Sequence, residues 1–289
     1  MTHQIQARVL LSRVRQPDPW FGLTYVMNLY RGCQHQCIYC DSRSECYGIQ
    51  DFADIGIKAN ALELLERELR RKRRKGTIGT GAMNDPYMPL EKTARLTGRA
   101  LRILAAHEFP VHVMTKSDLV LRDIDVLQDI RRTYAAVTFT ITTADDALGR
   151  VLEPGAPLVS RRLAALRRLA DAGILAGVAM MPVLPFLEDT EENVLAIARL
   201  AMDAGAHYLL PSFAVTLRDR QREYFYRQLD ASFPGLRQKY EACYGERYVC
   251  RVPLAAQLEH VFLETCDRLG LATRMPVYAA APGPQLPLL

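Results

Sequence analysis

The chain has 289 residues, of which 49% are hydrophobic, and its 37 basic and 32 acidic residues give a formal net charge of +5. This balance does not by itself indicate a nucleic-acid partner, and the odd count of seven cysteines does not suggest a disulfide framework. No apolar run approaches the roughly 18 residues of a membrane-spanning helix, and the N-terminal segment lacks the features of a signal peptide. We therefore expect a cytoplasmic protein that does not enter a membrane.

Strand and helix patterns alternate along the chain. The predicted strands cover residues 23–29, 77–81, 111–116, 135–143, 174–183 and 207–213, and the predicted helices cover 60–75, 90–107, 119–131, 160–172 and 190–204. Six strand–helix units in sequence predict a parallel sheet of the α/β class, and units of this size fit an incomplete (β/α)6 barrel over residues 1–215. Residues 216–278 are predicted to form a helical extension packed on the barrel, and residues 279–289 a flexible tail.

A basic run, RRKRRK at residues 70–75, ends the first predicted helix. Cations in the last turn suit the helix dipole, and Gly76 follows as a typical C-terminal cap. The run is interpreted mainly as a solvated helix end, with a phosphate-contacting patch as the alternative.

Three cysteines, Cys33, Cys37 and Cys40, form a C-x3-C-x2-C triplet directly after the first predicted strand. Three thiolates can bind three irons of a 4Fe–4S cluster and leave the fourth iron without a protein ligand, whereas structural clusters usually take four cysteines. An iron with an open position indicates chemistry. The alternative is a zinc site made by the same cysteines plus Cys46 or His35, although zinc usually takes paired C-x2-C knuckles separated by a longer spacer.

With Tyr39 at its aromatic position, the cysteine loop resembles the C-x3-C-x-aromatic-C motif of radical SAM enzymes. That resemblance implies an incomplete (β/α)6 barrel and a 4Fe–4S cluster held by Cys33, Cys37 and Cys40. It also implies S-adenosylmethionine (SAM) as the ligand of the open iron, with Tyr39 near this cofactor. In that superfamily, an electron from the cluster cleaves SAM to a 5′-deoxyadenosyl radical, and a reductant such as flavodoxin or ferredoxin is an expected partner.

Segments at the predicted strand ends resemble the spore photoproduct lyase-like branch of these enzymes. The turn with Asn84 and Asp85 resembles the one that binds the methionine end of SAM, which implies contacts to the cofactor's ammonium group. Lys116, from a Lys-Ser pair after the third strand, is expected to face the SAM carboxylate. Thr142 and Arg162 complete the expected cofactor-binding set, although β-propensity alone explains a threonine equally well. Glu153 is expected to pair with Arg162.

The chain departs from that branch at Ala82. Spore photoproduct lyases carry a cysteine three residues before the turn aspartate, where it donates a hydrogen atom, and this chain has alanine there. Cys46, Tyr87 or another tyrosine is the candidate substitute donor.

The chain ends in a Pro/Gly-rich stretch followed by Gln285, Leu286, Leu288 and Leu289. This ending resembles the short peptides by which bacterial replication and repair proteins dock on the sliding clamp, since it presents apolar anchors on a tether. The alternative is a leucine-rich terminus that folds back on the barrel, because short motifs often match by chance.

These features predict a radical SAM enzyme that abstracts hydrogen from a substrate, and the branch resemblance and the tail favour a lesion of a DNA nucleobase, as in a repair lyase. Two alternatives remain open. One is a radical SAM enzyme that acts on a small molecule, RNA or protein. The other is a non-enzymatic zinc-binding adaptor that docks through its tail.

Overall fold

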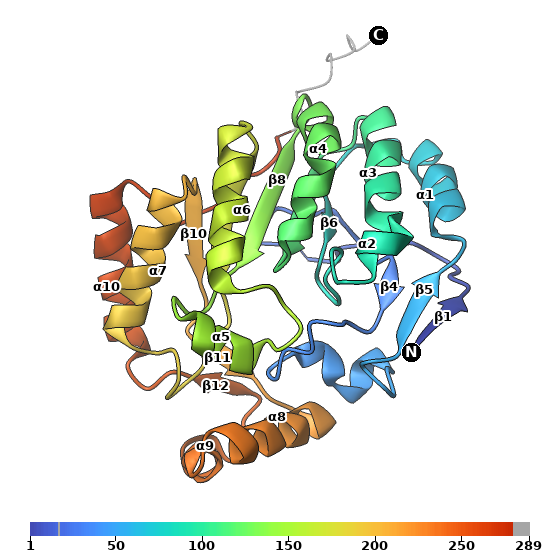
Figure 1. The fold of residues 1–289 in the computed structure, drawn as a ribbon. Coiled ribbons are helices and arrows are strands. Elements are labelled where there is room, and N and C mark those ends of the chain that lie inside the picture. Colours follow the sequence, from blue (N-terminus) through green and yellow to red (C-terminus); the bar gives the residue numbers. More distant parts are fainter. Residues whose placement is uncertain (17, 280–289) are drawn as a thin grey trace, which may run out of the picture.

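The computed structural model describes residues 1–16 and 18–279 (Figure 1). The predicted clamp-binding residues Gln285, Leu286, Leu288 and Leu289 lie outside the described residues. Within the described part of the chain, no helix combines the length and the apolar character that crossing a membrane requires.

A seven-stranded sheet forms the centre of the fold, in the order β10-β9-β8-β7-β6-β3-β2. Six of its strands are parallel and follow the six predicted strands: β3 (Tyr25–Met27), β6 (Ile78–Thr80), β7 (Val111–Thr115), β8 (Ala135–Thr140), β9 (Leu175–Met180) and β10 (Tyr208–Pro211). The incomplete (β/α)6 barrel predicted from the sequence is therefore confirmed. At one edge, β2 (Leu11–Arg13) pairs antiparallel with β3; this three-residue strand is too short for a periodic pattern to reveal it.

Helices connect the parallel strands and cover one face of the sheet (Figure 1). They are α1 (Ala61–Arg70), α3 (Leu96–Ala106), α4 (Ile124–Arg131, preceded by the 3-10 helix η3 at Asp118–Asp123), α6 (Val159–Asp171) and α7 (Glu191–Asp203). Each of these helices contributes fully buried apolar side chains to one main core shared with the strands: Leu65, Leu101, Leu127, Leu166 and Ile197. This one-sided apolar pattern is what allowed the helices to be predicted.

The predicted helix over residues 90–107 is in fact two helices, α2 (Glu91–Ala94) and α3. They are separated by Arg95, which adopts a left-handed conformation with φ of 49°. The carboxylate of Glu91 accepts hydrogen bonds from the backbone N–H groups of Leu96 and Thr97, at 2.8 Å for Leu96. A buried carboxylate thus replaces the helical carbonyls at the break.

Several short elements surround the cysteine segment. A small sheet contains β1 (Thr2–Ile5), β5 (Ile55–Lys58) and β4 (Tyr30–Arg31), and two 3-10 helices follow the cysteines, η1 (Asp41–Arg43) and η2 (Glu45–Tyr47). The helix α5 (Asp146–Leu152), which was not predicted, begins where the side chain of Asp145 accepts a hydrogen bond from Ala147 N at 2.7 Å. These pieces are too short to carry a helical or alternating pattern.

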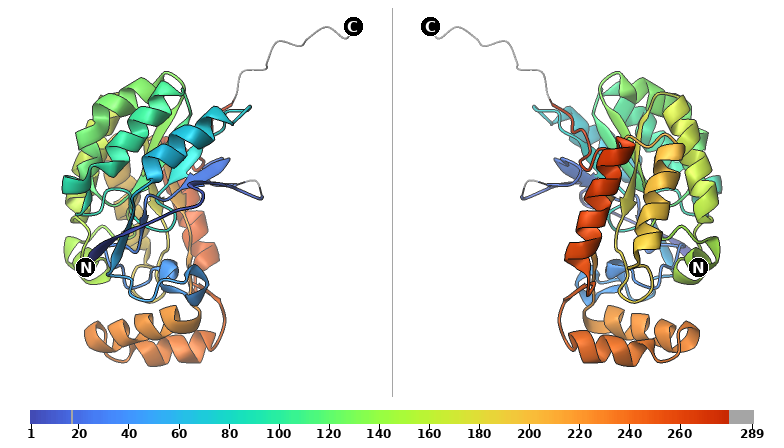
Figure 2. Two further views of the ribbon diagram at one scale, coloured as in Figure 1. Left: turned by 90° about the vertical axis from the view of Figure 1, so that its right-hand side faces the viewer. Right: turned by 90° about the vertical axis from the view of Figure 1, so that its left-hand side faces the viewer.

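The C-terminal part contains three helices and a strand pair. Strands β11 (Ala214–Thr216) and β12 (Val249–Arg251) pair antiparallel. In the sequence, α8 (Asp219–Ser232) and α9 (Leu236–Tyr244) lie between these two strands. Helices α8 and α9 lie at one end of the molecule, while α10 (Ala255–Leu269) runs along α7 (Figures 1 and 2). The aromatic side chains of Phe225 and Tyr240 share a buried cluster with Ile38 and Tyr39, so α8 and α9 support the cysteine loop.

The basic run at residues 70–75 lies at the opposite end of the parallel strands from the cysteine loop. This follows because α1 runs antiparallel to the strands and the run begins at the last residue of α1. The Lys75 ammonium pairs with Glu108 at 2.7 Å, and the Lys72 ammonium lies 4.5 Å from the centre of the Tyr25 ring. These contacts favour the solvated helix end over a phosphate patch at the site.

Candidate active site

The cysteine loop is anchored to the rest of the barrel by its own backbone. The N–H of Cys33 donates to the carbonyl of Phe52 at 3.2 Å, and the N–H of Ile38 donates to the carbonyl of Leu152 at 2.9 Å. Gly32 precedes the loop with φ of 81°, and a Cβ there would lie 2.9 Å from the carbonyl oxygen of Phe52. Only glycine fits this approach without a shift of the backbone.

The three cysteines line one cavity of about 180 Å³, the cluster cavity. Cys33 and Cys37 are each 7% exposed, and Cys40 is half-buried. Burial raises the pKa of the Cys33 thiol to about 12 and also raises that of Cys37. The thiols of Cys33 and Cys37 therefore keep their protons until a metal displaces them. Three thiols that line one cavity together with polar residues such as Asn84, Asp85 and Lys116 fit a 4Fe–4S cluster ligated at three irons.

Of the two extra ligands of the zinc alternative, His35 lines the cluster cavity with the cysteines and Cys46 does not. Cys46 is exposed, and its sulfur lies 3.4 Å from Ser44 Oγ. The buried His35 has Nε2 at 3.2 Å from Asp85 and Nδ1 at 3.0 Å from the carbonyl of Gly155. Within residues 1–16 and 18–279, no three His, Cys, Asp or Glu side chains form a group that could hold a single metal ion. The two extra ligands thus have other neighbours.

Asp85 lines the cluster cavity from the loop after β6, and its carboxylate accepts several hydrogen bonds. Its carboxylate accepts from Thr115 Oγ1 at 2.7 Å and from the N–H of Lys116 at 2.6 Å, beside the His35 contact. Burial alone would raise the pKa of Asp85, but the contacts with His35, Lys116 and Thr115 outweigh it and lower the pKa to about 2. Asp85 is therefore a fixed negative charge on the cavity wall.

Asn84 lies beside Asp85 on the wall of the cluster cavity and is 7% exposed. Its amide nitrogen donates to the carbonyl of Tyr30 at 2.8 Å. This bond ties the loop after β6 to the strand that precedes the cysteines, so the two loops form one wall.

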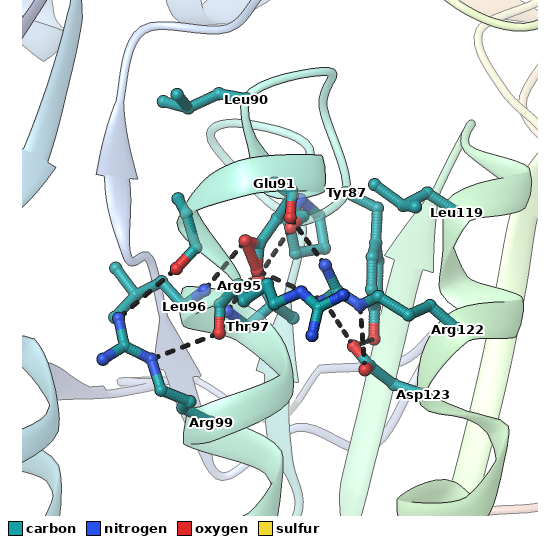
Figure 3. Close-up of polar contacts among 12 residues, drawn as sticks. Tyr87, Leu90, Glu91, Arg95, Leu96, Thr97, Arg99, Leu119, Arg122 and Asp123 are labelled. Atoms are coloured by element: carbon teal, nitrogen blue, oxygen red, sulfur yellow. Dashed lines mark hydrogen bonds and ion pairs between the residues drawn. The ribbon is translucent and has the colours of Figure 1, made fainter.

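A buried polar network fixes the loop that carries Asp85 (Figure 3). The Tyr87 hydroxyl donates to Asp123 at 3.1 Å, and the Arg122 guanidinium bonds the same carboxylate at 2.7 Å. Arg122 also donates to the backbone carbonyl of Glu91 at 2.6 Å. Since every member is paired, the network holds the loop rigidly against η3 and α2.

Glu153 is the centre of a second buried group, which reaches the cluster cavity through Lys116. Its carboxylate lies 2.5 Å from the Arg162 guanidinium and 3.7 Å from the Lys116 ammonium, and it accepts a hydrogen bond from the Tyr39 hydroxyl. Burial would raise the pKa of Glu153, but Arg162 and Lys116 lower it. Likewise, burial would lower the pKa of Lys116, but the anionic neighbours raise it. Lys116 therefore presents a fixed positive charge to the cavity.

The predicted cofactor residues divide by position. Asn84, Asp85 and Lys116 line the cluster cavity, as does Thr140. Arg162 is buried behind this wall, where it also donates to the carbonyl of Thr140 at 3.1 Å. Thr142 is buried too, and neither it nor Arg162 belongs to the described residues that line the cavity. Arg162 can therefore influence a bound ligand through Thr140 or through the Glu153–Lys116 contact.

The candidate hydrogen donors also lie apart from the cluster cavity. Tyr87 is fully buried and borders a separate cavity of about 430 Å³, with which the cluster cavity shares His35. Cys46 is exposed on η2. Ala82, in contrast, lines the cluster cavity. The position that departs from the lyase pattern is thus at the site, and the two substitutes proposed from the sequence stand outside it.

A further cavity of about 360 Å³, the aromatic cavity, adjoins the cluster cavity. The two share four residues, Cys40, Ser42, Ala82 and Met181. Three aromatic side chains line the aromatic cavity, Trp20, Tyr39 and Tyr47. Trp20 precedes β3 at one side of the sheet, and Ser212–Thr216 follow β10 at its other edge. The cavity therefore lies at the open side of the incomplete barrel.

Sequence reasoning missed the role of Trp20 at this cavity. It is the one tryptophan of the chain and is 42% exposed. Its segment carries no periodic pattern, and only its exposure in the folded chain marks it, since a large exposed aromatic ring beside a cavity is characteristic of binding sites. Tyr47, whose hydroxyl donates to Asp41 at 2.9 Å, was missed for the same reason.

Comparisons with known proteins agree with this geometry. A family model described as the radical SAM superfamily matches residues 27–201. Uncharacterized protein Rv2578c of Mycobacterium tuberculosis is 31% identical over 251 residues, which cover 84% of this chain and 73% of the relative. A radical SAM Nalpha-GlyT isomerase of Pseudomonas phage M6 is 21% identical over 267 residues, which cover 90% of this chain and 54% of the phage protein. The structure of spore photoproduct lyase complexed with dinucleoside spore photoproduct superposes with a TM-score of 0.70 at 17% sequence identity. The superposition covers 93% of this chain and 79% of the lyase chain.

Proposed function

Because the chain belongs to the radical SAM superfamily, we propose that it removes a hydrogen atom from a nucleobase lesion in DNA that enters the aromatic cavity. Membership makes the protein an enzyme with a 4Fe–4S cluster and SAM, which overturns the zinc-binding adaptor. When bound, these groups supply the 5′-deoxyadenosyl radical. Cys33, Cys37 and Cys40 would hold the cluster.

The residues of the cluster cavity suit the polar end of SAM. The fixed carboxylate of Asp85 can accept hydrogen bonds from an ammonium group, and the Lys116 ammonium can pair with a carboxylate. Glu153 and Arg162 keep the Lys116 side chain in place from behind. This arrangement would orient the cofactor before any substrate arrives.

The aromatic cavity carries the proposal for the substrate. Enzymes that act on a base in DNA take it out of the stack into a pocket and hold it against aromatic side chains. Trp20 and Tyr47 line this cavity, which meets the cluster cavity at Cys40 and Ala82. A planar base stacked there would lie next to the place where the radical forms.

The compared proteins support this substrate class. The solved structure of similar fold is a spore photoproduct lyase complexed with dinucleoside spore photoproduct, and the phage relative is a radical SAM Nalpha-GlyT isomerase. We carry over the nucleobase substrate as part of the proposal, but not the lyase reaction, because Ala82 stands where lyases have their donor cysteine. The proposal is limited to hydrogen removal.

The test is SAM cleavage coupled to substrate. Enzyme reconstituted with iron and sulfide under anaerobic conditions, then reduced with dithionite, is given SAM and one of four substrates: ultraviolet-irradiated DNA, undamaged DNA, RNA of the same sequence, or free nucleosides. We expect irradiated DNA to stimulate 5′-deoxyadenosine formation, with transfer of deuterium from a base-labelled strand. The Trp20→Ala variant should lose this stimulation while it retains slow uncoupled cleavage. Stimulation by RNA or nucleosides alone would refute a DNA substrate.

A further inference from the structure

An arginine-lined cavity of about 250 Å³ borders the cysteine segment away from the cluster cavity. It is bounded by Arg43 of η1 and by Arg220 and Arg227 of α8, the helix that lies below the cysteine segment in Figure 1. Asp51 is the one acidic side chain among its described lining residues. The cavity therefore carries an excess of positive charge.

These charges are not neutralised within the described part of the chain. Arg43 bonds Gln36 Oε1 at 2.7 Å, and Arg220 donates to the backbone carbonyl of Arg43 at 2.8 Å, so both meet neutral acceptors. The Arg43 guanidinium also lies over the Tyr224 ring, 3.7 Å from its centre. Burial lowers the pKa of Arg43, but a guanidinium remains charged in proteins. Arg227 is exposed and forms no ion pair with any described residue.

Arg43 links this cavity to the cluster ligands. Its Nε donates to the carbonyl of Cys37 at 3.5 Å. A group bound in the arginine cavity is thus separated from a cluster ligand by one side chain. Because electron transfer slows steeply with distance, a carrier bound at the arginine cavity would be well placed to reduce the cluster.

The arginine cavity is also separate from the substrate path. Among the described residues, its lining shares none with the cluster cavity or the aromatic cavity. The segment between Asp41 and Phe52 stands between them, with Ser42 and Tyr47 facing the aromatic cavity and Arg43 facing the arginine cavity. An electron carrier could therefore bind while substrate occupies the other side.

We propose that the arginine cavity is the docking site of an acidic one-electron carrier protein, with carboxylates around its flavin or iron–sulfur centre. One electron passes from the carrier, which is oxidised, to the cluster, which is reduced, and no proton or atom is transferred. Positive charge at the mouth steers an acidic partner and raises the association rate. This inference requires the 4Fe–4S cluster of the radical SAM superfamily, but it does not depend on DNA being the substrate.

The experiment compares two charge reversals in the reconstituted holoenzyme. Arg227→Glu changes the arginine cavity, and Arg199→Glu makes the same change on an exposed position of α7, on another side of the barrel. The rate of cluster reduction by reduced flavodoxin is followed by anaerobic stopped-flow absorbance at low ionic strength. We expect Arg227→Glu to slow it about tenfold and Arg199→Glu to change it less than about twofold. High salt should remove the difference.

Two further measurements make the result decisive. Reduction by dithionite should be equal in both variants and the parent, because it needs no docking. Equal loss with flavodoxin in the two variants would show a general charge effect and overturn the proposal. Loss of duplex DNA binding by Arg227→Glu with unchanged flavodoxin kinetics would also overturn it and assign the arginines to phosphate contacts instead.

Discussion

Gly155 packs against the carbonyl oxygen of Gln34 so closely that any Cβ at position 155 would overlap it. The N–H of Gly155 also donates to the carbonyl of His35 at 2.9 Å, and its own carbonyl faces the His35 ring. The loop after α5 thus clamps the cysteine loop through a contact between two backbones. Neither partner can move aside as a flexible side chain could.

This clamp predicts the effect of Gly155→Ala. Forced separation of the two loops should cost about 1–3 kcal/mol of unfolding free energy and should reduce the iron bound after reconstitution. Urea denaturation and iron analysis measure the two effects. Gly149→Ala in α5 is the matched control, because a Cβ there would lie 3.1 Å from the Val159 side chain and would not overlap a backbone atom. A Gly155→Ala protein with full iron content would contradict the clamp.

The cysteines should separate by role. Cys33→Ala, Cys37→Ala and Cys40→Ala should each abolish or strongly reduce the brown colour and the roughly four irons per chain of the reconstituted protein. Cys243→Ala, an exposed cysteine of α9, should keep both. Circular dichroism should show folded protein in every case. Full iron loading of a Cys40→Ala protein would refute the assigned ligand set.

The buried pair of Glu153 and Arg162 should be tightly coupled. Arg162→Met leaves the Glu153 carboxylate with Lys116 at 3.7 Å as its cation, so we expect a loss near 3 kcal/mol of unfolding free energy. Glu153→Gln in the same background should restore part of it, because the uncompensated charge is gone. Urea denaturation of the two single variants and the double variant tests this. Strictly additive losses would show that the pair is not coupled.

His112 should make the protein less stable in acid. It is buried in β7, with Nε2 at 2.7 Å from Thr138 Oγ1, and burial lowers its pKa from 6.5 to about 3. Between these values the unfolded chain binds a proton that the folded chain excludes, so stability is fully present above pH 6.5 and falls as the pH drops toward 3. From pH 7 to pH 5 the loss should reach about 2 kcal/mol.

The neutral variant His112→Gln tests that sign. Its unfolding free energy should fall less than that of the parent between pH 7 and pH 5, since glutamine does not titrate in this range. Denaturant titrations at both pH values supply the comparison. Identical pH dependence in the two proteins would exclude His112 as a contributor.

The terminal sequence supports a binding prediction of its own. A labelled peptide of residues 279–289 should bind the bacterial sliding clamp with a dissociation constant in the micromolar range, because two or three apolar anchors on a short tether bind modestly. Replacing Gln285 and Leu288 by alanine should abolish binding. A peptide that stays free at high micromolar clamp would remove this partner.

Much of the fold was predictable because its signals are local. The strands β6 to β10 are short runs that are buried on both faces, and the helices α3, α4, α6 and α7 each carry an apolar face that repeats at the helical period. The break at Arg95 was not predictable, since it depends on the Glu91 carboxylate turning back onto Leu96 and Thr97. The pairing of β11 with β12 depends on segments more than thirty residues apart, which no local window relates.

At the site, the sequence by itself determined the cysteine triplet that we propose as the cluster ligands and the polar residues at the strand ends. Cys33, Cys37 and Cys40 lie within one short loop, and parallel strands bring Asp85 and Lys116 to the same edge. The sequence also predicted the pairing of Glu153 with Arg162. Only the tertiary structure decided that Tyr39 and Lys116 join this pair, and that Trp20 and Tyr47 line one cavity. Those contacts arise where the barrel fails to close and distant loops meet, so their energies depend on neighbours that no local pattern specifies.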